Sequence, residues 1–80
     1  MPVIFRHEGF RFFFYANEGD PREPIHVHVE KDDLEAKFWM HPEISLAYND
    51  GFNARTLSRL VAVLEANRQR IIGAWDVFFT

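Results

Sequence analysis

The chain has 80 residues, the size of one small domain, and its nine phenylalanines, two tryptophans and two tyrosines provide large side chains for a core. It contains no cysteine, which excludes a disulfide framework and a thiolate zinc site, and its net charge of −3 excludes long-range attraction to nucleic acid without a local basic patch. No apolar run reaches the roughly 18 residues of a membrane span and the N-terminus lacks a signal-peptide pattern, so we expect a cytoplasmic protein without a membrane segment.

Two N-terminal strands are predicted at residues 3–6 and 10–16, joined by a turn in which Gly9 permits a tight backbone. The second strand is strongly β-prone because it is aromatic on both faces. Alternation with a period of two places Phe10, Phe12 and Phe14 on one side, and Arg11, Phe13 and Tyr15 on the other. We expect the two strands to form a hairpin.

The most informative stretch is residues 24–30, which reads Pro-Ile-His-Val-His-Val-Glu. Its two faces differ in chemistry: Ile25, Val27 and Val29 are apolar, whereas His26, His28 and Glu30 are polar. The apolar face suits a core. The polar face presents two imidazoles and a carboxylate, with about 7 Å between alternate positions of a strand.

The chain is expected to turn at residues 32–33 and to return as a strand over residues 34–40. A tight turn fixes the pairing of the apolar face as Val29 with Ala36, Val27 with Phe38, and Ile25 with Met40. The polar face then pairs Glu30 with Glu35, His28 with Lys37, and His26 with Trp39. Asp-Asp is a weaker turn former than Asn-Gly, so a longer loop with the same register is the alternative.

A last short strand is predicted at residues 44–48, and a helix follows over residues 53–79, capped by Asn53. The apolar residues of this helix recur at helical spacing: Leu57, Leu60, Val61, Leu64, Ile71, Trp75 and Phe78. The predicted architecture is a single α+β domain over residues 1–80. It has an antiparallel sheet of four to five strands in residues 1–49, with one long C-terminal helix packed on one face.

One helix covers only one face of a sheet. If the helix packs on the apolar face, the other face carries aromatic, histidine and charged side chains that interfaces favour: Arg11, Phe13, Tyr15, His26, His28, Glu30, Lys37 and Trp39. We interpret this face as a binding surface for a partner protein or for a second copy of the chain. The alternatives are single-stranded nucleic acid stacked on the rings, which is not favoured, and coverage by loops.

The same face permits two kinds of chemistry. His26 and His28, with Glu30 as a third ligand, form a weak metal-binding hypothesis, and no metal or cofactor is predicted. His26, His28 and Lys37 form a catalytic hypothesis in which the imidazoles transfer protons and the ammonium stabilises charge during RNA cleavage. No nucleophile motif or phosphate-binding loop accompanies them, so the sequence indicates no reaction and leans against an enzyme.

Three arginines, Arg55, Arg59 and Arg70, lie opposite the apolar stripe of the predicted helix. Guanidinium groups suit acidic partners or phosphates, so we include the three among the binding candidates. A merely solvated helix face is the alternative, and three arginines are too few to indicate a DNA-reading helix.

The stretch 24–30, the segment 35–39, the pair Gly51-Phe52 and the tail with Ala74-Trp75 and Phe78-Phe79 together resemble the prokaryotic domain-of-unknown-function family numbered 4160. The N-terminal hairpin fits this resemblance too, whereas the turn at residues 32–33 lacks the glycine that is frequent there in the family. The resemblance implies a small bacterial or archaeal cytosolic protein. Such genes often stand beside a second small gene, of family 2442, in a toxin–antitoxin-like arrangement. The family has no established activity, so it assigns no catalytic residue.

The leading hypothesis is a protein-binding module, or a subunit of a two-gene toxin–antitoxin-like pair, which engages the product of an adjacent gene through its aromatic and histidine sheet face. The alternatives are an RNA-cleaving toxin that uses His26 and His28, and a metal-binding or nucleic-acid-binding regulator. A homodimer is a further option for the same surface.

Overall fold

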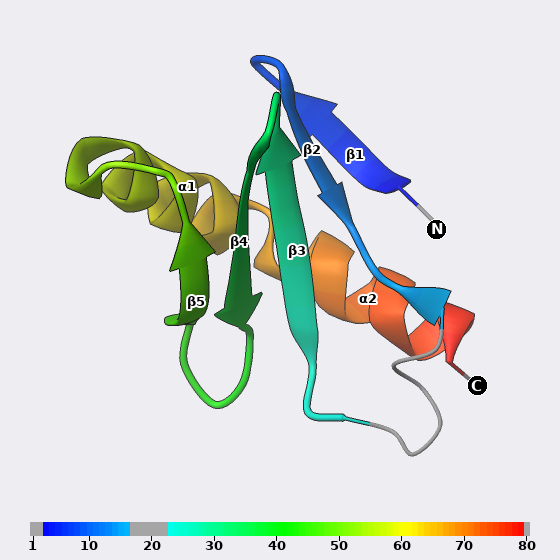
Figure 1. The fold of residues 1–80 in the computed structure, drawn as a ribbon. Helices are drawn as coiled ribbons and strands as arrows, with labels where there is room; N and C mark the ends of the chain where they lie inside the picture. Colours follow the sequence, from blue (N-terminus) through cyan, green and yellow to red (C-terminus); the bar gives the residue numbers. More distant parts are fainter. Residues whose placement is uncertain (1–2, 17–22, 80) are drawn as a thin grey trace.

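The computed structural model describes residues 3–16 and 23–79, and it forms a five-stranded antiparallel sheet with two helices on one face (Figure 1). The strands lie in the sheet in chain order: β1 (Val3–His7), β2 (Phe10–Phe13), β3 (His26–Lys31), β4 (Leu34–Trp39) and β5 (Ser45–Asp50). The helices are α1 (Ala54–Ala66) and α2 (Arg68–Phe78). The predicted α+β class and antiparallel sheet are confirmed.

The prediction of one long C-terminal helix is wrong, because the helix is interrupted at Asn67. The Asn67 side-chain amide donates a hydrogen bond of 2.8 Å to the carbonyl oxygen of Val63, and its backbone takes φ −113° and ψ 16°. A short polar side chain that bonds a carbonyl of the preceding turn competes with the regular helix. The apolar stripe nevertheless keeps its phase, since Leu64 in α1 and Ile71 in α2 are both buried.

The hairpin of β3 and β4 has the predicted register. Five of the six predicted pairs lie in the ladder, from His26 opposite Trp39 to Glu30 opposite Glu35, and it continues to Lys31 opposite Leu34. Beyond its other end, the Met40 N–H donates a hydrogen bond of 2.9 Å to the carbonyl oxygen of Ile25, in the same register. The turn is a tight one of two residues, and Asp32 takes a left-handed φ of 56°, a conformation that aspartate tolerates better than most residues. The longer loop considered as the alternative is therefore not formed.

The first hairpin also turns on two residues, Glu8 and Gly9, between the paired His7 and Phe10. Both central residues have positive φ, 50° for Glu8 and 84° for Gly9, as a type I′ turn requires. Glycine accepts this conformation without strain, but glutamate is an unusual choice for it.

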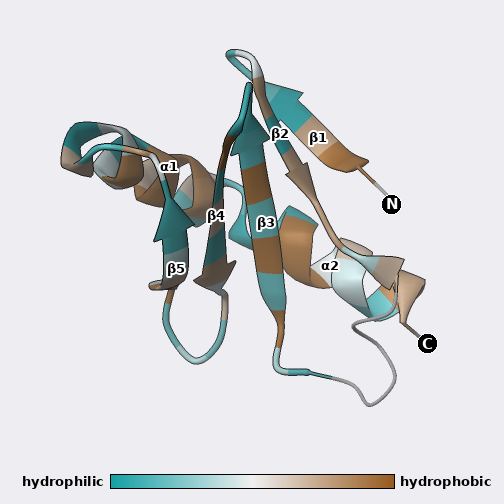
Figure 2. Ribbon diagram, in the orientation of Figure 1, coloured by the Kyte–Doolittle hydropathy of each residue, from teal (hydrophilic) through white to brown (hydrophobic). Residues whose placement is uncertain are grey.

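The core lies between the helices and the apolar face of the sheet. The alternating hydropathy of β3 is visible in Figure 2 as successive polar and apolar bands along the strand. Phe10 and Ile25, which were also predicted to face the helix, are only partly buried and pack against the edge of the core. The buried apolar cluster contains the other side chains predicted on that face, together with residues of both helices: Phe5, Phe12, Phe14, Val27, Val29, Ala36, Phe38, Met40, Phe52, Leu60, Leu64, Ile71 and Trp75. Asn53 caps α1 as predicted, accepting a hydrogen bond of 2.8 Å from the backbone N–H of Thr56.

Among the described residues, neither helix is long and apolar enough to cross a membrane.

Candidate functional site

The face of the sheet opposite the helices is here called the histidine face, and it carries Arg11, Phe13, Tyr15, Glu23, His26, His28, Glu30, Glu35, Lys37, Trp39 and Tyr48. The strand pairing fixes how these side chains are arranged. One row across β2, β3, β4 and β5 consists of Phe13, His28, Lys37 and Tyr48, each opposite the next. The structure therefore brings the predicted candidates of β2, β3 and β4 together on one surface.

His28 lies at the centre of a hydrogen-bonded cluster. Its Nδ1 is 3.3 Å from Glu35 Oε2 and 3.4 Å from the hydroxyl oxygen of Tyr48. Tyr48 donates a hydrogen bond of 2.6 Å to Glu35 Oε2, and Tyr15 donates one of 3.3 Å to Glu35 Oε1. One carboxylate thus accepts from two phenols while it faces the imidazole.

The rings of Phe13 and Tyr15, whose centroids are 5.2 Å apart, both pack against His28. The Tyr15 ring meets the imidazole edge-on at a centroid distance of 4.5 Å, and the Phe13 ring is stacked on it at 5.5 Å. Only 3% of His28 remains exposed. His28 is therefore shielded from solvent by its neighbours on this face.

His26 is fully buried and links the two faces of the sheet. Its Nδ1 lies 2.9 Å from the carbonyl oxygen of Pro24, to which an N–H at this position donates. The centroid of its ring lies 5.6 Å from that of Trp39 on the histidine face and 4.9 Å from that of Trp75 in α2. The alternation of the sequence placed His26 on the face away from the helix, but the ring also reaches the helical layer.

The cations of the histidine face are paired with carboxylates. Lys37 Nζ lies 3.1 Å from Glu23 Oε1 and 4.5 Å from the centroid of the Trp39 ring. Arg11 forms an ion pair with Glu30, and its guanidinium lies over the Phe13 ring at 5.1 Å. Lys37, the predicted stabiliser of charge in catalysis, is thus held by an acid and a ring.

The weak metal hypothesis for His26, His28 and Glu30 has no support in the geometry. Glu30 is engaged by Arg11, and within residues 3–16 and 23–79 no three histidine or carboxylate side chains are arranged to hold a metal ion. The polar atoms around the histidines instead bond one another.

The three helix arginines are all exposed: Arg55 and Arg59 lie one turn apart on α1, and Arg70 lies on α2. Arg70, in α2, lies over the ring of Phe5 at 4.7 Å. Arg59, in α1, lines a pocket between that helix and the first hairpin, whereas Arg55 does not line it. A second, apolar pocket lies between β1 and α2 and includes Val3, Ile4, Phe14, Gly73, Ala74, Val77 and Phe78. Neither of these pockets is on the histidine face.

Sequence reasoning missed three residues of the site: Glu23, Glu35 and Tyr48. Glu23 lies before the histidine strand, in a segment expected to be a polar loop, and nothing in the sequence indicates its ion pair with Lys37. The predicted pairing places Glu35 opposite Glu30, but it does not indicate that the carboxylate accepts hydrogen bonds from two phenols. Tyr48 falls in the predicted last strand, for which the sequence predicts no pairing register. A bulge between Lys37 and Phe38 sets that register by bringing Tyr48 opposite Lys37.

A comparison of the chain with curated proteins and with solved structures found no match. The model of the family described as "Domain of unknown function (DUF4160)" matches residues 9–76, which includes every strand residue of the histidine face. Because this match spans most of the 80 residues, the chain belongs to that family.

Proposed function

We propose that the protein is a binding module that engages a partner protein through the histidine face, the partner being the product of an adjacent gene in a toxin–antitoxin-like pair. The observation that carries the proposal is a sheet whose helices cover one face, while half-buried or exposed rings of Tyr15, Trp39 and Tyr48 lie on the other. Interfaces concentrate their binding energy in a few such aromatic anchors.

The rings are also held in place before any partner arrives. Tyr15 and Tyr48 are both hydrogen-bonded to Glu35, and Trp39 lies beneath the ammonium of Lys37. Side chains that are already ordered lose less conformational entropy on binding. This arrangement favours a surface that receives a partner without rearrangement.

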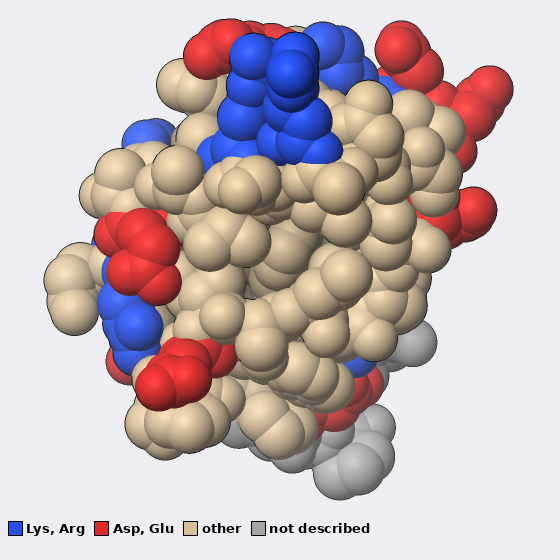
Figure 3. Space-filling model, turned by 90° about the vertical axis from the view of Figure 1, so that its left-hand side faces the viewer, with Lys and Arg blue, Asp and Glu red and all other residues tan. Residues whose placement is uncertain are grey.

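The charges on this face favour a protein partner over nucleic acid. Arg11 and Lys37 are each paired with a carboxylate, and Glu35 adds a further negative group. Figure 3 views the edge of the sheet at β5 together with α1, beside the histidine face, and shows a broad area without charged side chains there. On β5, the side chain of Tyr48 is 45% exposed, so the aromatic contact area extends to this edge of the sheet.

The experiment compares two variants by calorimetry against the neighbouring gene product. Trp39→Ala is expected to lose more than about 2 kcal/mol of binding free energy, because truncating a central aromatic anchor has an effect of this size. The double variant His26→Gln, His28→Gln is expected to lose much less, since the two imidazoles are at most 3% exposed. Melting curves establish that each variant is folded.

Growth on induction of the gene separates binding from RNA cleavage. A catalyst needs His26 and His28 as proton carriers, so the double variant would lose toxicity while Trp39→Ala kept full binding. That pair of results would replace the binding module with the RNA-cleaving toxin. If the double variant does not fold, Lys37→Gln takes its place, because Lys37 lies nearer the surface and is the third catalytic candidate. A homodimer is tested by measuring the mass of the protein alone in solution.

A further inference from the structure

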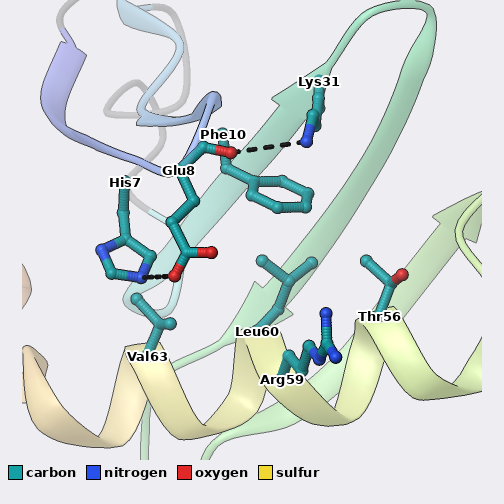
Figure 4. A pocket seen from close by; sticks show the side chains of 8 residues that line it. All are labelled: His7, Glu8, Phe10, Lys31, Thr56, Arg59, Leu60 and Val63. Carbon is teal, nitrogen blue, oxygen red and sulfur yellow. Dashed lines mark hydrogen bonds and ion pairs between the residues drawn. The ribbon is translucent and has the colours of Figure 1, made fainter.

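A pocket of about 190 Å³ lies between the first hairpin and α1, away from the histidine face (Figure 4). It is called the hairpin pocket, and it is lined by His7, Glu8, Phe10, Lys31, Thr56, Arg59, Leu60 and Val63. Pockets for drug-sized ligands measure about 300–1,000 Å³, so this one suits a small ligand.

Two cations reach the hairpin pocket from different walls. Lys31 comes from the end of β3 and Arg59 from α1, as Figure 4 shows. The Lys31 ammonium lies 4.7 Å from the centroid of the Phe10 ring and 3.4 Å from the backbone oxygen of Glu8, a long contact that leaves most of its donor capacity unused. Within the described part of the chain, Arg59 has no carboxylate within salt-bridge distance.

The start of α1 adds to the positive potential of this pocket. Thr56 lies in the first turn of the helix, where the backbone dipoles leave a partial positive charge. Helices often place acidic side chains there, but the first turn of α1 contains none. The Thr56 hydroxyl supplies a further hydrogen-bond donor beside the two cations.

The opposite end of the pocket is different in character. The carboxylate of Glu8 lies 3.0 Å from Nε2 of His7, and Glu8 takes its position with a left-handed φ of 50°. Leu60 and Val63 of α1 rise beneath it and form an apolar floor (Figure 4). A carboxylate there repels an anion but accepts hydrogen bonds from hydroxyl groups.

We propose that the hairpin pocket binds a small sugar phosphate, with the phosphate between Lys31, Arg59 and Thr56 and the sugar on the apolar floor beside Glu8. A phosphate monoester has three terminal oxygens and carries close to two negative charges, which matches two cations and a hydroxyl better than a carboxylate does. The sugar hydroxyls donate to Glu8. This site is independent of the proposed partner surface, since none of its residues belongs to the histidine face.

The test titrates the labelled protein with ribose 5-phosphate and with ribose while amide NMR shifts are recorded. Ribose 5-phosphate is expected to bind at least about tenfold more tightly than ribose, because hydrogen bonds to charged groups are the stronger ones. The largest shifts are expected at Gly9 and Thr56. Equal affinity for the two sugars, or shifts centred on another part of the chain, would overturn the proposal.

Three glutamine variants assign the affinity to the pocket. Arg59→Gln and Lys31→Gln are each expected to weaken ribose 5-phosphate binding about tenfold or more. Arg55→Gln removes the same charge one helical turn from Arg59 but outside the pocket, and it is expected to weaken binding clearly less than Arg59→Gln, because Arg55 makes no direct contact with the ligand and only its partly screened field reaches the site. A loss in Arg55→Gln as large as that in Arg59→Gln contradicts a specific site.

The same phosphate group also occurs at the 5′ end of RNA. A 5′-phosphorylated oligonucleotide is therefore titrated alongside, and weaker binding than that of ribose 5-phosphate is expected, because the chain carries a net charge of −3 and the pocket is small. Tighter binding of the oligonucleotide would overturn the assignment to a small ester.

Discussion

The two faces of the sheet both contain fully buried side chains, yet different interactions bury them. On the helical face, Val27, Val29 and Phe38 are covered by apolar residues of α1 and α2. On the histidine face, Phe13 is equally buried without a helix above it, because Arg11 and Tyr15 lie against its ring. A low exposed fraction therefore does not by itself identify the hydrophobic core of this protein.

The difference predicts how each face responds to substitution. Apolar packing is stabilised by buried area and tolerates changes that conserve volume. A hydrogen-bonded cluster depends on the position of each donor and acceptor, and one missing partner leaves the others unsatisfied. His26 belongs to both faces, since its ring contacts Trp39 on one side and Trp75 on the other.

Truncating a large side chain between the helices and the sheet should have the largest effect on stability. Trp75→Ala removes a fully buried ring whose centroid lies 5.1 Å from that of Phe14 and 4.3 Å from that of Phe79. The same ring also packs against the imidazole of His26. We expect a loss of about 3–5 kcal/mol in the free energy of unfolding, as is usual for large aromatic residues in a core. Urea denaturation measures it.

The control for this substitution lies on the same helix. Val77 is 79% exposed, so Val77→Ala should leave the unfolding free energy within about 0.5 kcal/mol of the parent. Similar midpoints for Trp75→Ala and Val77→Ala would mean that α2 is not docked on the sheet, and the comparison of the two faces would fail.

On the histidine face a smaller loss is expected from removing the shared acceptor. Glu35→Ala takes away the carboxylate that accepts from Tyr15 and Tyr48, and we expect a loss of about 1–3 kcal/mol because both phenols then lack that partner. Thermal unfolding measures the loss, and Glu65→Ala, on the exposed surface of α1, is the matched control. No loss in Glu35→Ala would mean that water replaces the carboxylate and that the cluster does not stabilise the fold.

The parts of the fold that depend on local patterns were predictable from the sequence. The register of β3 and β4 followed from the alternation of Val27 and Val29 and from the two residues available for the turn. The buried residues of the helices, Leu60, Leu64, Ile71 and Trp75, followed from their spacing, whereas Phe78, predicted on the same stripe, is 41% exposed.

Other features depend on contacts between distant segments. Tyr48 reaches Glu35 only because a bulge in the pairing of β4 with β5 sets its register, and nothing in residues 44–50 marks that bulge. The contact of His26 with Trp75 depends on how α2 docks. The interruption at Asn67 was missed because the apolar spacing continues across it, from Leu64 to Ile71.

The smallest effect on stability is expected from a substitution at Asn67. It tests whether the break between α1 and α2 is needed to dock α2 on the sheet. Asn67→Ala removes the side-chain hydrogen bond of 2.8 Å to Val63, but alanine favours the helix by roughly 0.5–0.7 kcal/mol over asparagine. The two contributions nearly cancel, so we expect a change within about 0.5 kcal/mol in unfolding free energy and a small gain in helical circular dichroism near Asn67. The NMR signals of His26 should be unchanged, because Leu64 and Ile71 already share one phase of the stripe and keep Trp75 against the imidazole. A loss above about 2 kcal/mol, together with shifted His26 signals, would show instead that the break at Asn67 directs α2 onto the sheet.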